Sequence, residues 1–182
     1  MRHINIIRSI LLIISIFLIT SCSNNSAMKP EDFKNKEPRL VIEEYMTGNV
    51  KAWGVLQNRS GKVTRQFSAD LNGAWDGKQL ILKEKFNWDD GEVQDREWTI
   101  NKIDQHNYEG TAGDVVGKAK GYSYGPAFKF EYVLLVPVKG KEIKITFDDW
   151  IFMQDEKVAI NRAIMSKFGI KVAELTVMFV KD

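Results

Sequence analysis

From Lys51 onward the sequence repeats a short alternating pattern, and this repetition limits the possible folds more than any other feature of the chain. Ten segments alternate apolar and polar residues or are rich in β-branched and aromatic residues, with no helical pattern between them. Turn residues separate several of them, as at Asn58–Gly61 and Asp89–Gly91. The segments lie near residues 50–58, 62–73, 79–88, 92–103, 107–115, 117–124, 127–138, 142–153, 157–168 and 171–181. Short strands at this spacing predict an antiparallel meander.

A meander of about nine or ten strands removes its exposed edges by closing on itself. The predicted fold is therefore all-β, a single antiparallel up-and-down barrel over residues 38–182 with a short N-terminal helix. Pro38 before Arg39–Met46 and Gly48 after it are typical of a helix start and stop. The chain of 182 residues is long enough for one such domain with a real core.

The turn positions also predict which residues face each other. A two-residue turn at Asp76-Gly77 places Leu71 opposite Leu82. A three-residue loop at Asp89–Gly91 places Leu82 opposite Trp98 on the following strand. Both registers put apolar residues opposite each other, and a slip of one residue would destroy that agreement.

The same registers place charged residues on the inward face. Glu84 falls opposite Arg96, and a loop centred on Asp155-Glu156 places Asp149 opposite Arg162. One interpretation is that each is a structural ion pair that fixes the register. The other is that one arginine also binds the carboxylate or phosphate of a ligand inside the barrel, a task suited to its fork of donors.

The N-terminal segment indicates where the protein resides. Arg2 and Arg8 flank a short basic start, and Ile10–Ile19 is an apolar run with the length of a secretory signal rather than of a permanent membrane span. Small residues just before Cys22 make the segment resemble the lipobox of bacterial lipoproteins. This resemblance implies a signal peptide over residues 1–21, lipid on Cys22 and a flexible tether over residues 22–37.

Ser23 follows the expected lipidated cysteine, and by the sorting rule of enterobacterial lipoproteins a residue other than aspartate implies the outer membrane. The sequence therefore predicts a periplasm-facing protein whose contact with the membrane is the lipid on Cys22. Without Arg2 and Arg8 the 26 basic and 24 acidic residues balance, which argues against a nucleic-acid partner.

Few residues suited to metal or nucleophilic chemistry remain after signal removal. The single cysteine is used for the lipid, which leaves no disulfide, thiol nucleophile or cysteine zinc site. His106 is the only histidine beyond the signal and lies in an expected turn, so a histidine metal site is excluded. We expect no metal and no cofactor.

Several short motifs are spread along the expected barrel. They are Trp53-Gly54, Leu82-x-Glu84-x-Phe86, Asp90-Gly91-Glu92, Arg96-Glu97-Trp98, Tyr108-x-Gly110, Asp114–Gly121, Asp148-Asp149-Trp150, Asn161-Arg162 and Lys167-Phe168-Gly169. Together these motifs resemble a bacterial lipoprotein family of unknown function, catalogued as domain-of-unknown-function family 3833. The resemblance covers about residues 38–180 and carries no established activity or catalytic residues.

A wider similarity is to lipocalin-like (calycin) barrels. These have a tryptophan on the first strand that is covered by an arginine of the closing strand, positions that Trp53 and Arg162 could fill. The chain departs from that pattern at Lys51, where lipocalins have glycine. If Arg162 stacks on Trp53, the resemblance implies a structural lock rather than a ligand contact.

We expect the barrel to bind a hydrophobic or amphipathic ligand such as a fatty acid or lipid, with no catalysis. Aromatic and aliphatic walls would hold the chain of the ligand, and an arginine its acidic head group. The candidate ligand-binding residues are Arg96, Glu84, Arg162, Asp149, Trp98 and Trp53.

Two other classes of function stay open. In the first, a filled barrel is an adaptor that docks a protein partner on outward apolar residues, namely Val133, Leu135, Trp150 and Phe152. In the second, a barrel enzyme acts on a lipid, which requires Glu84 or Asp149 with a raised pKa.

Overall fold

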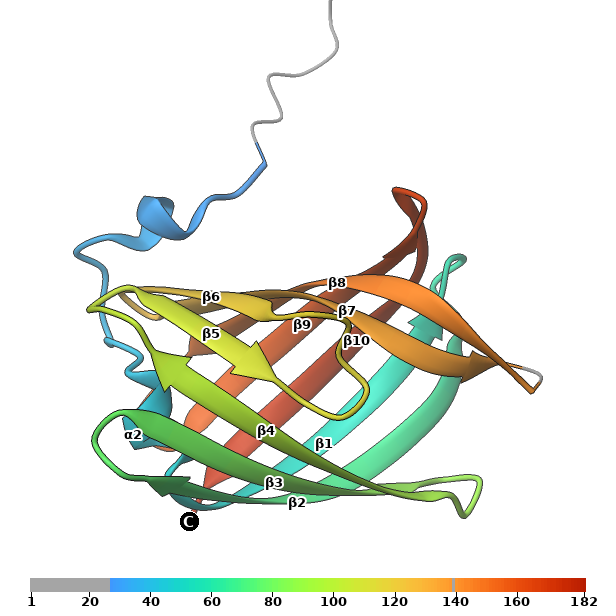
Figure 1. Ribbon diagram of the computed structural model, residues 1–182, viewed down its shortest axis with the longest axis horizontal. Helices are drawn as coiled ribbons and strands as arrows, with labels where there is room; N and C mark the ends of the chain where they lie inside the picture. Colours follow the sequence, from blue (N-terminus) through green and yellow to red (C-terminus); the bar gives the residue numbers. More distant parts are fainter. Residues whose placement is uncertain (1–26, 139) are drawn as a thin grey trace, which may run out of the picture.

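Ten antiparallel strands follow one another around a closed barrel (Figure 1). The computed structural model describes residues 27–138 and 140–182, so Cys22 and the expected signal peptide lie outside the described residues. The elements are η1 (Pro30–Phe33), α2 (Ile42–Met46), β1 (Gly48–Asn58), β2 (Val63–Trp75), β3 (Gln79–Trp88), β4 (Val93–Lys102), β5 (Asn107–Thr111), β6 (Ala119–Tyr124), β7 (Ala127–Val138), β8 (Lys141–Met153), β9 (Val158–Lys167) and β10 (Ile170–Lys181). The predicted all-β up-and-down barrel with a short N-terminal helix is confirmed.

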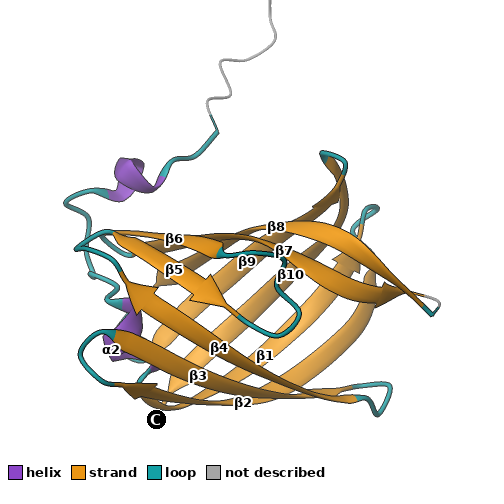
Figure 2. Cartoon of the chain, viewed as in Figure 1, coloured by secondary structure: helices purple, strands orange, loops and turns teal. Residues whose placement is uncertain are grey.

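Each strand pairs with its neighbours in sequence, and β1 pairs with β10 to close the barrel. Alternate residues of the strands point inward and form one main core, with Phe128 and Leu80 fully buried. Among the described residues, helical structure is confined to the segment before β1 (Figure 2). Neither helix in the described part of the chain is long and apolar enough to cross a membrane.

The short helix α2 closes one end of the barrel. Ile42 and Met46 are buried against the core. The hydroxyl of Tyr45 donates to the backbone carbonyls of Lys157 (2.9 Å) and Phe179 (3.2 Å), which connects α2 to the β8–β9 loop and to β10. A Cβ atom on Gly73 would lie 1.9 Å from the carbonyl oxygen of Met46, so glycine permits the close approach of α2 to β2. The opposite end carries the β1–β2, β3–β4, β7–β8 and β9–β10 turns (Figure 1).

The predicted registers are partly correct. Leu82 lies opposite Trp98, as the Asp89–Gly91 loop predicts. The Leu71–Leu82 prediction is wrong by two residues, because Leu82 pairs with Gly73. The Oδ1 atom of Asp76 accepts hydrogen bonds from the backbone N–H groups of Lys78 (2.8 Å) and Gln79 (2.7 Å). The turn therefore starts later in the chain than expected. A shift of two keeps every side chain on its predicted face.

The observed register between β8 and β9 differs from the predicted one by one residue, which moves the side chains of β9 to the opposite face of the sheet. Arg162 pairs with Trp150, and Asp149 pairs with Ala163. The prediction that Asp149 faces Arg162 is therefore wrong. The loop holds three residues between Gln154 and Val158, whose backbones are hydrogen-bonded at 2.8 Å, rather than the two that the prediction assumed.

The loop over residues 112–118 completes the wall of the barrel beside β7. The N–H of Val116 donates to the carbonyl of Val133 at 2.8 Å, and the N–H of Leu135 donates to the carbonyl of Asp114 at 2.9 Å. On the other side of this loop lies β4, and β5 pairs only with the last four residues of that strand, Thr99–Lys102. The first half of β4 therefore has no backbone pairing with β5. Side chains rather than backbone hydrogen bonds therefore connect the loop to the first half of β4.

The segment before the barrel covers part of its outer surface. The ring of Phe33 in η1 lies 5.9 Å from Trp150 and 5.4 Å from Phe152, measured between ring centroids. Trp150 is consequently buried rather than exposed. The expectation that Trp150 and Phe152 present an open apolar patch to a protein partner is wrong, because the chain covers them itself.

Candidate functional site

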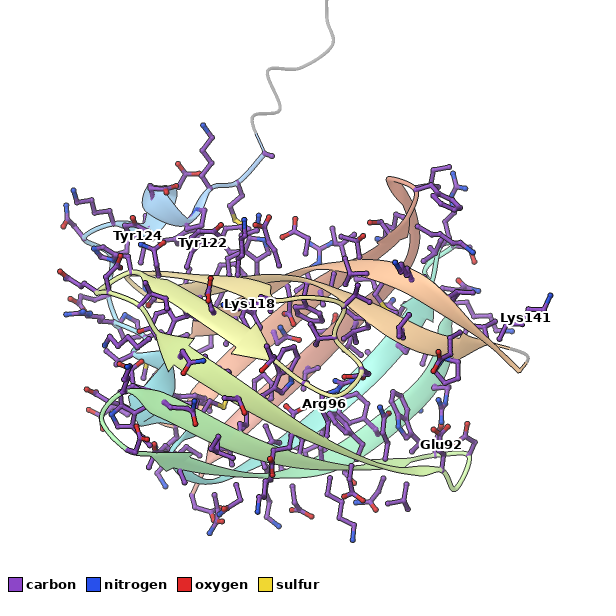
Figure 3. All side chains as sticks on the ribbon, in the orientation of Figure 1. Glu92, Arg96, Lys118, Tyr122, Tyr124 and Lys141 are labelled. Atoms are coloured by element: carbon purple, nitrogen blue, oxygen red, sulfur yellow. The ribbon has the colours of Figure 1, made fainter. Side chains whose placement is uncertain are left out.

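A cluster of charged side chains lies inside the barrel, at the middle of β3 and β4. Glu84 and Arg96 lie opposite each other, as predicted, and their Oε2 and Nη1 atoms are 3.9 Å apart. Arg96 makes its closer ion pair with Asp114, to which its Nη2 and Nε atoms donate at 2.7 and 3.1 Å. Figure 3 shows Arg96 beside the loop that carries Asp114. The arginine thus connects β4 to the 112–118 loop.

Asp149 of β8 also faces the interior. The hydroxyl of Tyr132 donates to its Oδ2 atom at 2.9 Å, and the amide of Asn161 donates to its Oδ1 atom. Asn161 is buried and takes the place that sequence reasoning gave to Arg162. Arg162 points outward, pairs with Glu174 and has 60% of its side chain exposed, so it cannot contact a ligand in the barrel.

The two predicted tryptophan positions differ in the same way. Trp98 is buried inside the barrel, with the centroid of its ring 5.3 Å from that of Tyr132, and it lines the inner cavity together with Glu84. Trp53 lies on the outer face opposite Met178 and is 45% exposed. The predicted contact of Trp53 with a ligand in the barrel is therefore wrong. Arg162 lies on the same outer face but on β9, with β10 between it and Trp53.

Two adjacent cavities border the charged cluster. The inner cavity has a volume of about 110 Å³ and extends from α2 to the cluster. The outer cavity has a volume of about 240 Å³ and lies toward the end with the four hairpin turns. Their shared lining residues are Phe67, Phe86, Arg96, Tyr132 and Leu175. The two cavities therefore lie next to each other inside the barrel, and both have a largely apolar wall.

Burial changes the ionisation of the interior carboxyl groups. It raises the pKa of Glu84 to about 7, although the positive charge of Arg96 opposes the shift. It raises the pKa of Asp149 to about 6, against the hydrogen bonds from Tyr132 and Asn161. Burial alone would lower the pKa of Arg96, but the neighbouring carboxylates raise it, so the guanidinium stays charged.

The cluster carries more acid than base. Glu84, Asp114 and Asp149 contribute three carboxyl groups against the guanidinium of Arg96. Arg65, which lines the outer cavity, is itself paired with two carboxylates of the β3–β4 turn at 2.7 and 2.9 Å. No cation in the lining of either cavity is therefore free to bind an anionic group.

Three buried polar atoms in the lining of the outer cavity have no hydrogen-bond partner among the described residues. They are the Nε atom of Arg65, the indole nitrogen of Trp88 and the Oδ1 atom of Asp114. Buried polar groups are almost always paired in native structures. Two donors and one acceptor are thus available to a bound molecule.

A barrel enzyme that acts on a lipid would need Glu84 or Asp149 with a raised pKa, and both carboxyl groups have one. The lining of the two cavities contains no serine, cysteine, histidine or lysine that could be a nucleophile. Across residues 27–138 and 140–182, no group of histidine, cysteine or acidic residues is arranged to hold a metal ion.

The closed barrel with one plugged end and an interior cavity defines a lipocalin-like protein. Its fold is similar to the S-type phycobiliprotein lyase CPES from Guillardia theta, with a TM-score of 0.57 and 10% identity over 77% of this chain and 90% of that one. It is also similar to a protein of unknown function of the DUF3598 family from Nostoc punctiforme, with a TM-score of 0.60 and 14% identity. That match covers 81% of this chain and only 51% of the Nostoc protein.

The chain belongs to the family described as "Protein of unknown function (DUF3833)", whose pattern matches residues 16–181. The resemblance found in the sequence motifs is thereby confirmed. No curated protein matches the chain. At these identities the two solved structures establish the fold alone, and the function has to be inferred from the site.

Proposed function

We propose that the barrel binds an elongated ligand with an apolar chain and a neutral or cationic hydrogen-bonding group, such as a hydroxyl, amide or amine. The observation that carries the proposal is the pair of cavities that adjoin the cluster of Glu84, Arg96 and Asp149, one on the α2 side and one on the side of the open end. Lipocalin-like barrels of this strand number are wide enough to hold one small ligand.

The chemistry of the cluster favours this head group over the acidic one expected from the sequence. Arg96 already pairs with Asp114, and a carboxylate beside it would also face Glu84 and Asp149. Like charges at such short range in a low-dielectric interior repel strongly. An amine would instead neutralise the excess acid, and a hydroxyl or amide could satisfy the unpaired donors and acceptor of the outer cavity.

The cluster is better explained by binding than by folding. Burial opposes the charged forms of Glu84 and Asp149, and apolar residues of similar volume would give a more stable barrel. Groups that disfavour the fold and line a cavity are typical of functional sites.

A matched set of ligands tests the proposal. We would titrate a chain starting at residue 23, which keeps every described residue, with palmitic acid, its alcohol and its amine. Because the apolar chain is the same, the differences in Kd report the head group alone. The amine and the alcohol should bind more tightly than the acid at about pH 8, where the interior carboxyl groups are ionised.

A variant assigns any preference to the cluster. Asp149→Asn removes one interior negative charge and should weaken binding of the amine more than binding of the alcohol. Asp148→Asn changes the neighbouring carboxylate of β8, whose side chain is 50% exposed on the outer face, and should leave both affinities unchanged. Saturable binding of palmitate alone would refute the head-group assignment, and no binding of any of the three would refute the ligand-binding function.

We also propose that the protein is held at the outer membrane by lipid on Cys22 and faces the periplasm. The support is the lipobox-like sequence that precedes Cys22 and the serine that follows it. Mass spectrometry of the N-terminal peptide from the purified membrane form tests this. A diacylated cysteine at the N-terminus is the expected result, and an unmodified Cys22 within a longer peptide would contradict it.

A further inference from the structure

The turn between β9 and β10 exposes apolar side chains at the open end of the barrel. Phe168 is 93% exposed and adopts a left-handed backbone conformation with φ of 51°. Ile170 is 55% exposed, and Val172 is 37% exposed beside a register shift in β10. Because none of these side chains packs on the barrel core, this turn adds exposed apolar surface that folding does not explain.

The β1–β2 turn lies next to it, because Asn58 of β1 pairs with Ala173 of β10. We call residues 58–63 and 167–172 together the docking tip. Their sequences, NRSGKV and KFGIKV, contain four basic residues and no acidic residue. Lys171 is paired with Glu174 of β10, so the charge offered to a partner comes mainly from Arg59, Lys62 and Lys167. Val63 adds a further apolar side chain that is 43% exposed.

We propose that the docking tip inserts into the surface of an anionic lipid bilayer and so points the open end of the barrel at the membrane. Aromatic side chains favour the membrane–water interface, and lysines beside an inserted apolar group can keep their charge at the headgroups. Clustered basic residues are attracted to anionic lipids. The mixture of exposed apolar and exclusively basic residues on two adjacent turns fits this partner better than a mixed-charge protein surface.

The N-terminal segment lies on the same side of the barrel as the docking tip. In Figure 1, η1 stands above the end that α2 closes and the β9–β10 turn stands above the opposite end, both on the upper side of the barrel. Cys22 precedes residue 27 by five positions, a length of at most about 18 Å for extended chain. A lipid at Cys22 would hold the barrel close to the bilayer, so that the docking tip could reach the bilayer surface. The proposal does not depend on which ligand the barrel binds.

Depth-dependent quenching of tryptophan fluorescence tests the proposal on the full chain. The protein is reconstituted in vesicles of phosphatidylglycerol and phosphatidylethanolamine with or without brominated acyl chains. Phe168→Trp places a reporter in the docking tip, and Lys78→Trp places one in the β2–β3 turn, an exposed position at the end closed by α2. Wild-type emission is subtracted to remove the native tryptophans.

The emission added by Phe168→Trp should shift to shorter wavelength and lose most of its intensity with brominated lipid, while that added by Lys78→Trp should do neither. Adding Lys167→Glu to Phe168→Trp should reduce the quenching in these vesicles but have little effect in vesicles of phosphatidylcholine alone. Equal quenching of the two reporters, or an unquenched reporter at position 168, would overturn the proposal, and the second result would favour a protein partner for the tip. Both reporters lie at exposed turn positions, so loss of folding does not confuse the result.

Discussion

Replacing Glu84 with glutamine should stabilise the barrel at alkaline pH while changing its stability little in acid. Burial raises the pKa of the Glu84 carboxyl from 4.5 to about 7. The unfolded chain therefore releases this proton at lower pH than the folded chain does. Stability falls as the pH rises through that interval, and the full loss is present above the folded-state pKa. Glutamine has a similar shape and does not titrate, so the variant escapes the loss.

The size of the effect follows from the shift. At 1.36 kcal/mol for each pKa unit, the change from 4.5 to about 7 corresponds to about 3 kcal/mol between strongly acidic and alkaline solution. Part of that range lies below about pH 5, where other carboxylates also titrate. Between about pH 5 and pH 8 we therefore expect the free energy of unfolding of Glu84→Gln to rise by about 2 kcal/mol relative to that of the wild type.

Urea unfolding followed by tryptophan fluorescence measures this difference directly. The wild type, Glu84→Gln and the control Glu97→Gln, which changes an exposed carboxylate on the outer face of β4, are compared at both pH values. Only Glu84→Gln should unfold at higher urea at the alkaline pH. An equal destabilisation by Glu84→Gln at both pH values would refute the reasoning, because Glu84 would then be the ionised half of a structural ion pair.

Two further predictions concern the plug and the arginines. Gly73→Ala should destabilise the barrel by about 1–3 kcal/mol in thermal unfolding, because the new Cβ atom would meet the backbone carbonyl of Met46. The control Gly113→Ala, whose new Cβ atom has no other atom within 4 Å, should leave the stability unchanged. Equal melting temperatures for the two variants would contradict the close contact between α2 and β2. Arg96→Met should cost about 3–5 kcal/mol in urea unfolding because it leaves buried carboxylates unpaired, while Arg162→Met on the outer surface should cost less than about 1 kcal/mol. Similar losses for the two arginine variants would show that the interior placement of Arg96 is wrong.

The strands and their closure could be predicted from the sequence because local chemistry determines them. The alternating pattern marks each strand, and Gly91, which has a φ of 87°, determines the β3–β4 loop and with it the pairing of Glu84 with Arg96. The β8–β9 loop has no glycine to determine its length. Its one extra residue moved Arg162 to the outer face and brought Asn161 beside Asp149.

The closer partner of Arg96 was beyond local reasoning. In the sequence, Asp114 is only the first residue of the Asp114–Gly121 motif, and nothing in the residues around it indicates where it lies. Its position depends on the backbone pairing of the 112–118 loop with β7, a contact between segments distant in the sequence. The same tertiary pairing explains why an arginine expected to be free for an acidic ligand is already occupied.

Analysis of what the native protein carries tests the central claim most directly. The full chain would be purified from its own membranes, extracted with organic solvent and analysed by mass spectrometry beside Ala52→Leu, a variant that fills the inner cavity. The account predicts a molecule with an apolar chain and a hydroxyl, amide or amine group that accompanies the wild type in near-equal amount and is depleted from the variant. Equal recovery from both proteins, or a wild-type protein that carries only acidic lipids, would contradict it.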